Sequence, residues 1–409
     1  MADFLLTLSH QIFCMKFLVV VTIAFCSLFT IHATAQTDAG KPVKIAVFSP
    51  VYLDSAFTNN NYKLGNSNLP KNILPGLEFY TGVMMAIDSL QSENAHIEVL
   101  YFDSKSSDQP MNKVLAQPVW DSVSLIIASF NNRTDVKPLA DFAAKKNIPL
   151  ISSTFPNDGG TSNNPFFILI NSTLRTHCEG LYRYIQKNYS TGNLVYIKKK
   201  GAVEDMIQSI FTEMGKNTPS IPLKYKTIEL TDSFSSKQLL SSLDSNKQNI
   251  VICGTINEPF GARLVKTLNA SRRYQAVAIG MPTWDGIKDL NQSAALDSKG
   301  IEIIYSSPYN FSRNEKLSKY LTKKYKDIYF ARASDWVFKG YESMYHFTKL
   351  LLQYKDDFVN HLSSKDFTVF NEFDVQPVKL KKDNIVPDYL ENKKLYFIKK
   401  QDGVVKSVN

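Results

Sequence analysis

Hydrophobic and polar positions alternate along the chain in two ways from Val43 onward. Short apolar, β-branched runs are typical of strands buried on both faces, and apolar residues three and four positions apart are typical of the helices that cover them. The run 43–49 (VKIAVFS) predicts a first strand, and Tyr80, Met84 and Ile87 predict a helix that begins near Pro75 and ends near Leu90. The other elements predicted up to residue 170 are strands at 96–102, 123–128 and 148–152 and a helix at 135–146. This order predicts an α/β fold with a parallel sheet.

The alternation begins again after Asn171, which predicts a second, similar lobe. The predicted elements of this set are helices at 174–187, 207–214, 235–243 and 260–268 and strands at 193–197, 223–230, 250–253 and 276–279. Helical spacing at 314–329 and 334–354 predicts a return to the first lobe, and the tail from Phe367 predicts further strands. We therefore expect two doubly wound parallel-sheet lobes with a ligand cleft between them. The N-terminal lobe is assigned 43–170 plus about 312–355, and the C-terminal lobe 171–311 plus about 356–409.

The first 35 residues have the pattern of a signal peptide. An uncharged apolar run, 17–31, follows Lys16 and precedes the small residues Ala33-Thr34-Ala35. We expect cleavage after Ala35 and export of the protein; the alternative is an uncleaved membrane anchor, for which the run is short. Translation could begin at Met1 or at Met15, because Met15-Lys16 makes the better start of a signal peptide. Cleavage leaves two cysteines, Cys178 and Cys253, either paired or buried as free thiols.

Composition narrows the class of protein. The 409 residues are 44% hydrophobic, a share too high for a disordered chain. A polytopic membrane protein is excluded as well, because no apolar run after residue 31 is long enough to span a bilayer. The 47 basic against 38 acidic residues give a net charge of +9 that is spread along the chain, so we expect no nucleic-acid partner.

The sequence contains none of the common catalytic motifs. GxxxxGK[ST], GxGxxG after a strand, GxSxG and HExxH are all missing, and the four histidines that follow the signal peptide lack metal-ligand spacing. We expect a protein that is not an enzyme, with no catalytic residue, metal or cofactor. Lys198–Gly201 (KKKG) follows a strand and is either an anion contact or a solvated basic turn, and Trp284 follows another strand as either an aromatic wall for a ligand or a packing residue.

Several segments together resemble the type I periplasmic-binding-protein-like superfamily, in its branched-chain amino-acid receptor branch. They are KIAVFSP (44–50), FYTGVMMAIDSL (79–90), FDSKS (102–106), NIPLISST (147–154) and FKGYESMYHFTKLL (338–351). Two more, GMPTWDGI (280–287) and IEIIYSSPYNF (301–311), are similar to a Bacteroidota subgroup whose members often carry LysM domains, which this chain lacks. The resemblance implies a periplasmic substrate-binding protein that closes on a small molecule and delivers it to an inner-membrane ABC permease.

The resemblance also implies where a ligand binds in the first lobe. In amino-acid receptors of this type, a serine/threonine pair after the third strand holds the ligand carboxylate. Here Arg133 stands where a small hydroxyl residue is usual, and Thr134 retains the second. A guanidinium could hold a carboxylate or phosphate in two hydrogen bonds, fill the pocket, or pair with a surface acid. The next part of the pocket corresponds to Ser152, Ser153 and Thr154.

In the second lobe the resemblance is weaker at the ligand positions. The family's ligand tyrosine falls near Thr255, and the acid that holds the ligand ammonium falls near Pro282, where Asp285 or Glu258 could substitute. Two functions remain open. One is an exported solute-binding protein for a small polar, amino-acid-like ligand, serving ABC-type uptake or sensing. The other is a peptidoglycan-associated structural or sensory protein of the cell envelope that kept the fold without transport.

Overall fold

The computed structural model describes residues 41–408, except 60, 66–68, 272, 288–289, 291–299, 311, 313–314 and 382. Residues Val43–Asn409 form one compact unit. The predicted signal peptide, its cleavage site and both candidate start residues lie outside the described residues. Among the helices that are described, none combines the length and apolarity needed to cross a membrane.

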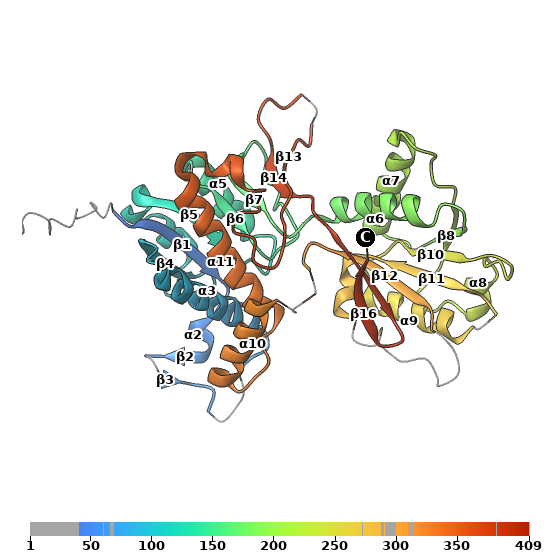
Figure 1. Cartoon of the computed structure of the whole chain (residues 1–409), viewed down its shortest axis with the longest axis horizontal. Coiled ribbons are helices and arrows are strands. Elements are labelled where there is room, and N and C mark those ends of the chain that lie inside the picture. The colour runs from blue at the N-terminus through green and yellow to red at the C-terminus, as the bar shows by residue number, and fades with distance from the viewer. Residues whose placement is uncertain are drawn as a thin grey trace, which may run out of the picture. The chain divides into compact units, whose positions relative to one another are not determined.

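The first sheet has seven strands in the order β13-β14-β7-β6-β5-β1-β4 (Figure 1). All neighbours are parallel except the antiparallel pair β13 and β14. The strands are β1 (Val43–Ser49), β4 (Ile97–Asp103), β5 (Val123–Ala128), β6 (Leu150–Ser152), β7 (Phe167–Leu169), β13 (Val375–Val378) and β14 (Tyr389–Asn392). A separate two-stranded hairpin, β2 (Phe57–Thr58) and β3 (Asn61–Tyr62), follows the short helix α2 (Leu53–Ala56).

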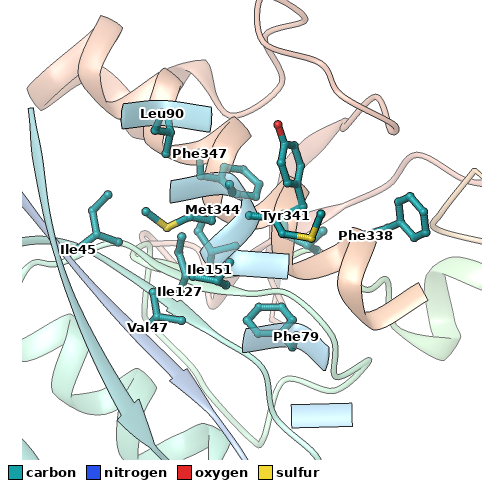
Figure 2. Close-up of a cluster of buried hydrophobic side chains, with 14 of the residues drawn as sticks. Ile45, Val47, Phe79, Leu90, Ile127, Ile151, Phe338, Tyr341, Met344 and Phe347 are labelled. Carbon is teal, nitrogen blue, oxygen red and sulfur yellow. The ribbon is translucent and has the colours of Figure 1, made fainter. Parts of the chain in front are cut away.

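Alternate residues of the first sheet enter two different cores. Ile45, Val47, Ile127 and Ile151 pack with α3 (Leu74–Ser92), α10 (Lys316–Tyr329) and α11 (Asp335–Tyr354), as Figure 2 shows for α3 and α11. The opposite face packs on α4 (Met111–Leu115), the 3-10 helix η2 (Pro118–Ser122) and α5 (Val136–Lys146). Helices α3 and α11 touch backbone to backbone, because a Cβ at Gly82 or Gly340 would overlap a carbonyl oxygen of the other helix.

The second sheet also has seven strands, in the order β16-β15-β12-β11-β10-β8-β9. They are β8 (Asn193–Lys198), β9 (Lys226–Glu229), β10 (Asn249–Cys253), β11 (Ala276–Gly280), β12 (Glu302–Ser307), β15 (Tyr396–Gln401) and β16 (Val404–Val408). β15 is antiparallel to both of its neighbours, β12 and β16, and the other pairs are parallel. One face packs on α6 (Leu174–Asn188) and α7 (Ala202–Asn217), and the other on α8 (Ser236–Leu240) and α9 (Glu258–Ala270). Two mainly parallel sheets covered by helices confirm the predicted fold class.

Cys178 and Cys253 are both free and buried. Cys178 belongs to the core on the α6 face of the second sheet, and Cys253 belongs to the core on the opposite face. Burial raises the pKa of both thiols to about 12.

The tail corrects the expected lobe boundary. We assigned about 356–409 to the C-terminal lobe, but Leu390 and Glu391 of β14 pair with β7 of the first sheet, and only β15 and β16 pair into the second. Phe358, Leu362, Phe370 and Phe373 likewise pack in the first-sheet core with α11. The hydrophobic pattern of the tail predicts that strands form, but it does not say which sheet each strand joins.

Among the described elements, the chain passes between the two sheets three times, from β7 to α6, from β12 to α10 and from β14 to β15. Buried Glu391 joins the first and third passages. Its Oε1 accepts hydrogen bonds from Thr173 N (2.7 Å), Thr173 Oγ1 (2.8 Å) and Thr176 Oγ1 (2.7 Å), and its Oε2 lies 2.6 Å from Lys393 Nζ. Asn392 reinforces the junction, because its carbonyl accepts from Ser172 Oγ at 2.7 Å.

Candidate functional site

Polar residues follow the ends of neighbouring strands in the first sheet. Ser49 pairs with Asp103 at the ends of β1 and β4, and Ala128 pairs with Ser152 at the ends of β5 and β6. Because these strands are parallel, their carboxyl ends meet at one edge, where ligands bind in doubly wound folds. This edge is the candidate site in the first lobe.

The end of β6 supplies three hydroxyl side chains, all of them predicted from the sequence as ligand contacts. Ser152, Ser153 and Thr154 are 0%, 1% and 5% exposed. Thr154 Oγ1 is engaged by Ser129 Oγ at 3.1 Å and by the backbone of Phe130. The Ser152 and Ser153 hydroxyls have no partner within the described chain. A buried hydroxyl without a partner costs about 1–3 kcal/mol, so two adjacent ones mark a place where a polar ligand group would be stabilising.

A residue from the second passage between the sheets reaches this position. Tyr309 donates a hydrogen bond to the carbonyl of Ser153, and Lys339 Nζ lies 4.2 Å from the centre of the Tyr309 ring. Burial raises the pKa of the Tyr309 phenol, which keeps it a donor. Sequence reasoning missed Tyr309, although it lies in the quoted segment 301–311.

The structure places Arg133 and Thr134 differently from the three β6 residues. Both are exposed, in the loop that precedes α5. Thr134 Oγ1 donates to Asn132 Oδ1 at 2.8 Å, and Arg133 Nη2 lies 3.7 Å from the position of a Cβ on Gly160, in the loop between β6 and β7. Arg133 is therefore solvent-accessible beside this loop.

The loops after β1 and β4 add a further aromatic side chain that sequence reasoning missed. Asp103 Oδ1 accepts hydrogen bonds from the backbone N–H groups of Val51 (3.0 Å) and Tyr52 (3.2 Å), and its Oδ2 from that of Leu53 (2.8 Å). This bonding holds Tyr52 in the left-handed backbone region, at φ 55°. The Tyr52 phenol oxygen then accepts from Asn131 Nδ2 at 2.7 Å, which links the β1 loop to the β5 loop. Asp103 of the FDSKS segment, which ends the strand β4, was the available sequence signal.

In the second sheet, Thr255 lies just after β10 and is fully buried. Its Oγ1 donates to Glu204 Oε1 at 2.6 Å and accepts from Asn257 N at 3.1 Å. Glu204 is a half-buried residue in the first turn of α7, close over Gly201, where a Cβ would overlap Glu204 Oε2. The carboxylate beside Thr255 thus comes from the helix after β8. Sequence reasoning missed Glu204, because it considered only Asp285 and Glu258 as substitutes for the family's acid.

Asp285 and Glu258, the two acids that the sequence suggested, make contacts with other residues. Asp285 Oδ1 accepts a hydrogen bond from the buried phenol of Tyr305 at 2.7 Å. Glu258 is exposed in the first turn of α9, 3.5 Å from the position of a Cβ on Gly286. Neither carboxylate hydrogen-bonds Thr255 in the described structure.

The sequence left two roles open for Trp284, an aromatic wall for a ligand or a packing residue, and its surroundings are those of a packing residue. It is 0% exposed and belongs to the core between the second sheet and α9. Its indole lies directly against Gly280 and Gly261, and its Nε1 has no partner among the described residues.

The lysines of the turn after β8 are each paired with a carboxylate. Lys198 Nζ lies 2.5 Å from Asp205 Oδ1, Lys199 Nζ 2.6 Å from Asp232 Oδ1, and Lys200 Nζ 3.8 Å from Glu229 Oε1. The turn is therefore neutralised locally. Across the described ranges, no cluster of three or more His, Cys, Asp or Glu could hold a metal ion.

Comparison with known proteins identifies the fold. Neither a family model nor a curated protein matches the chain. Among solved structures, a putative branched-chain amino acid ABC transporter from Rhodospirillum rubrum matches with a TM-score of 0.62 and 11% identity, over 90% of this chain and all of that one. A branched chain amino acid ABC transporter periplasmic ligand-binding protein from Burkholderia xenovorans gives 0.57 and 13%, over 90% and 94%. The branched-chain amino acid transporter substrate binding protein LivJ from Streptococcus pneumoniae, in complex with isoleucine, gives 0.51 and 15%, over 90% and 99%. These similarities show that the chain has the type I periplasmic binding protein fold.

Proposed function

We propose that this protein is an exported solute-binding protein that closes its two lobes on a small polar ligand, for ABC-type uptake or sensing. The observation that carries the proposal is the pair of buried, unpartnered hydroxyls on Ser152 and Ser153 at the carboxyl edge of the first sheet. The fold supports it, because the similar structures are those of substrate-binding proteins.

The ligand that fits these groups carries an anionic and a cationic end, as an amino acid does. The Ser153 hydroxyl would donate to its carboxylate, with Arg133 and Thr134 in the loop after β5 as further contacts. In the second lobe, the Glu204 carboxylate, held by Thr255, would accept from its ammonium. Glu204 would then serve where the family places an acid near residue 282.

A second candidate function is a structural or sensory role in the cell envelope without transport. Its support is the replacement of two ligand residues expected for amino-acid receptors, by Arg133 and by Pro282. This candidate has peptidoglycan rather than a permease as partner, and it predicts that no amino acid, short peptide, sugar or nucleoside stabilises the protein.

A thermal-shift screen against amino acids, short peptides, sugars, nucleosides and muropeptides separates the two candidates. A ligand at a hundred times its dissociation constant adds about 2.7 kcal/mol to the free energy of unfolding and raises Tm by a few degrees. No shift with any compound would reject the solute-binding function.

The site itself is tested by calorimetry on a compound that gives a shift. Ser153→Ala and Glu204→Gln should each weaken binding by roughly tenfold or more, since a hydrogen bond to a charged group contributes about 1.5–3 kcal/mol. Glu213→Gln, which changes an exposed acid of the same helix more than two turns from Glu204, is the matched control and should bind as the wild type does. Equal affinity in all three variants would show that the ligand binds elsewhere.

A further inference from the structure

A groove of about 710 Å³ lies in the second lobe, at the opposite end of β8 from Thr255. It is formed by α6, α7, the segment 223–226 and the turns that lead into β8 and β10 (Figure 1 labels α6, α7 and β8). The groove contacts the start of β8 at Asn193, whereas the candidate site lies beyond its end at Lys198. Six residues of strand separate the two by roughly 17–20 Å, so the groove is distinct from the site proposed above.

The charged side chains that line the groove are all positive. Lys224, Lys226 and Lys247 line it, all three are exposed, and none makes an ion pair with the described residues. None of the described residues that line it is acidic. The three consecutive lysines after β8 behave differently, because each is within 4 Å of a carboxylate. Lysines on an edge strand also discourage strand pairing, but of the three groove lysines only Lys226 belongs to β9.

A buried polar side chain lies under these lysines. Tyr182 of α6 lines the groove although it is 0% exposed, and its phenol oxygen accepts a hydrogen bond from Leu223 N at 2.9 Å. Gly215 of α7 lines the groove next to this phenol, and a Cβ there would sit 3.4 Å from the Tyr182 oxygen. The buried hydrogen bond therefore fixes Leu223, and with it the segment that carries Lys224 and Lys226, against α6.

We propose that this groove is a second binding site, for a small multivalent oxyanion such as a phosphorylated or polycarboxylated metabolite. Lysine ammonium groups bind such oxygens as point charges, and the buried hydrogen bond between Tyr182 and Leu223 holds the segment that carries two of these lysines. The volume of the groove lies within the range of small-molecule sites.

The test measures binding of two probes, inorganic pyrophosphate and citrate, to the purified protein by calorimetry at low ionic strength. A charge contact near the surface changes affinity by up to about fivefold, so the variant in which Lys224, Lys226 and Lys247 are all changed to Ala should bind roughly a hundredfold more weakly. The matched control changes three exposed lysines of the first lobe that also lack ion pairs, Lys71, Lys113 and Lys145, to Ala, and it should bind as the wild type does.

A steric variant keeps the charge and alters the groove. Gly215→Ala places a methyl group at an ordinary contact distance from the Tyr182 oxygen, in a helix that favours Ala over Gly, so it should leave Tm unchanged or higher while weakening both probes. No binding of either probe to the wild type, or an equal loss in the control, overturns the proposal. Full binding by Gly215→Ala also overturns it, because the lysines would then attract anions without a groove.

Discussion

Glu391 offers a test of how the two sheets are held together. Its side chain is 1% exposed and joins β14 to the passage that leads into α6. Three donors from Thr173 and Thr176 point at Oε1, and the Lys393 ammonium lies 2.6 Å from Oε2. Glu391→Gln keeps the size and one acceptor oxygen, but it turns an amide NH₂ toward Lys393 and removes the charge.

The expected loss follows from these contacts. A hydrogen bond to a charged group contributes about 1.5–3 kcal/mol, and breaking a fully buried ion pair costs about 3–5 kcal/mol. The Lys393 side chain is 23% exposed and stays partly solvated, so we expect about 3 kcal/mol. For a folded unit of roughly 370 residues, the entropy of unfolding is about 0.8 kcal/mol per kelvin, which converts this loss to about 4 °C in Tm.

Differential scanning calorimetry of wild type and variant measures the shift. Glu372→Gln is the matched control, because Glu372 also faces two lysines, Lys365 at 3.0 Å and Lys394 at 3.3 Å, but is 40% exposed. Exposed pairs contribute below about 1 kcal/mol each, so losing the two together should lower Tm by less than about 2.5 °C. A Glu391→Gln shift no larger than that of Glu372→Gln would refute the argument that this buried carboxylate holds the passage.

Two further predictions concern buried rings. Burial lowers the pKa of His177 to about 3, so the folded protein keeps it neutral while the unfolded chain protonates it below about pH 6.5. Protonation of the unfolded chain therefore lowers the free energy of unfolding of the wild type as the pH falls below about 6.5, by about 2 kcal/mol at pH 5. Urea denaturation at pH 7.5 and pH 5 measures this loss, which should be smaller in His177→Gln. An equal loss in the variant would contradict the prediction. Trp284→Ala should cost about 3–5 kcal/mol and Trp284→Phe much less, measured by thermal unfolding, because the indole fills the core and its N–H has no partner. Loss of ligand binding by Trp284→Phe at unchanged Tm would instead favour the aromatic wall.

The hydrophobic pattern by itself determined the fold class and most of the elements. In the run VKIAVFS apolar residues fall on both faces of an extended chain, which is typical of a strand buried on both sides, and the predicted strand 43–49 is β1 as observed. The predicted helices 174–187 and 334–354 agree with α6 and α11 to within a residue or two. A helix or a strand is marked by the pattern of a few consecutive residues, which is why these elements could be predicted from the sequence.

Only the tertiary structure decided which distant residues meet. Glu204 and Thr255 are 51 positions apart, and their hydrogen bond exists because β8 and β10 are adjacent and parallel in the second sheet. The tail divides between the sheets because β14 pairs with β7 while β15 pairs with β12. Trp284 follows a strand end, as a ligand-facing residue would, yet its ring turns inward because Gly261 and Gly280 leave room for it. Strand partners, side-chain direction and the space left by a glycine are long-range properties, and no local pattern of apolar and polar residues specifies them.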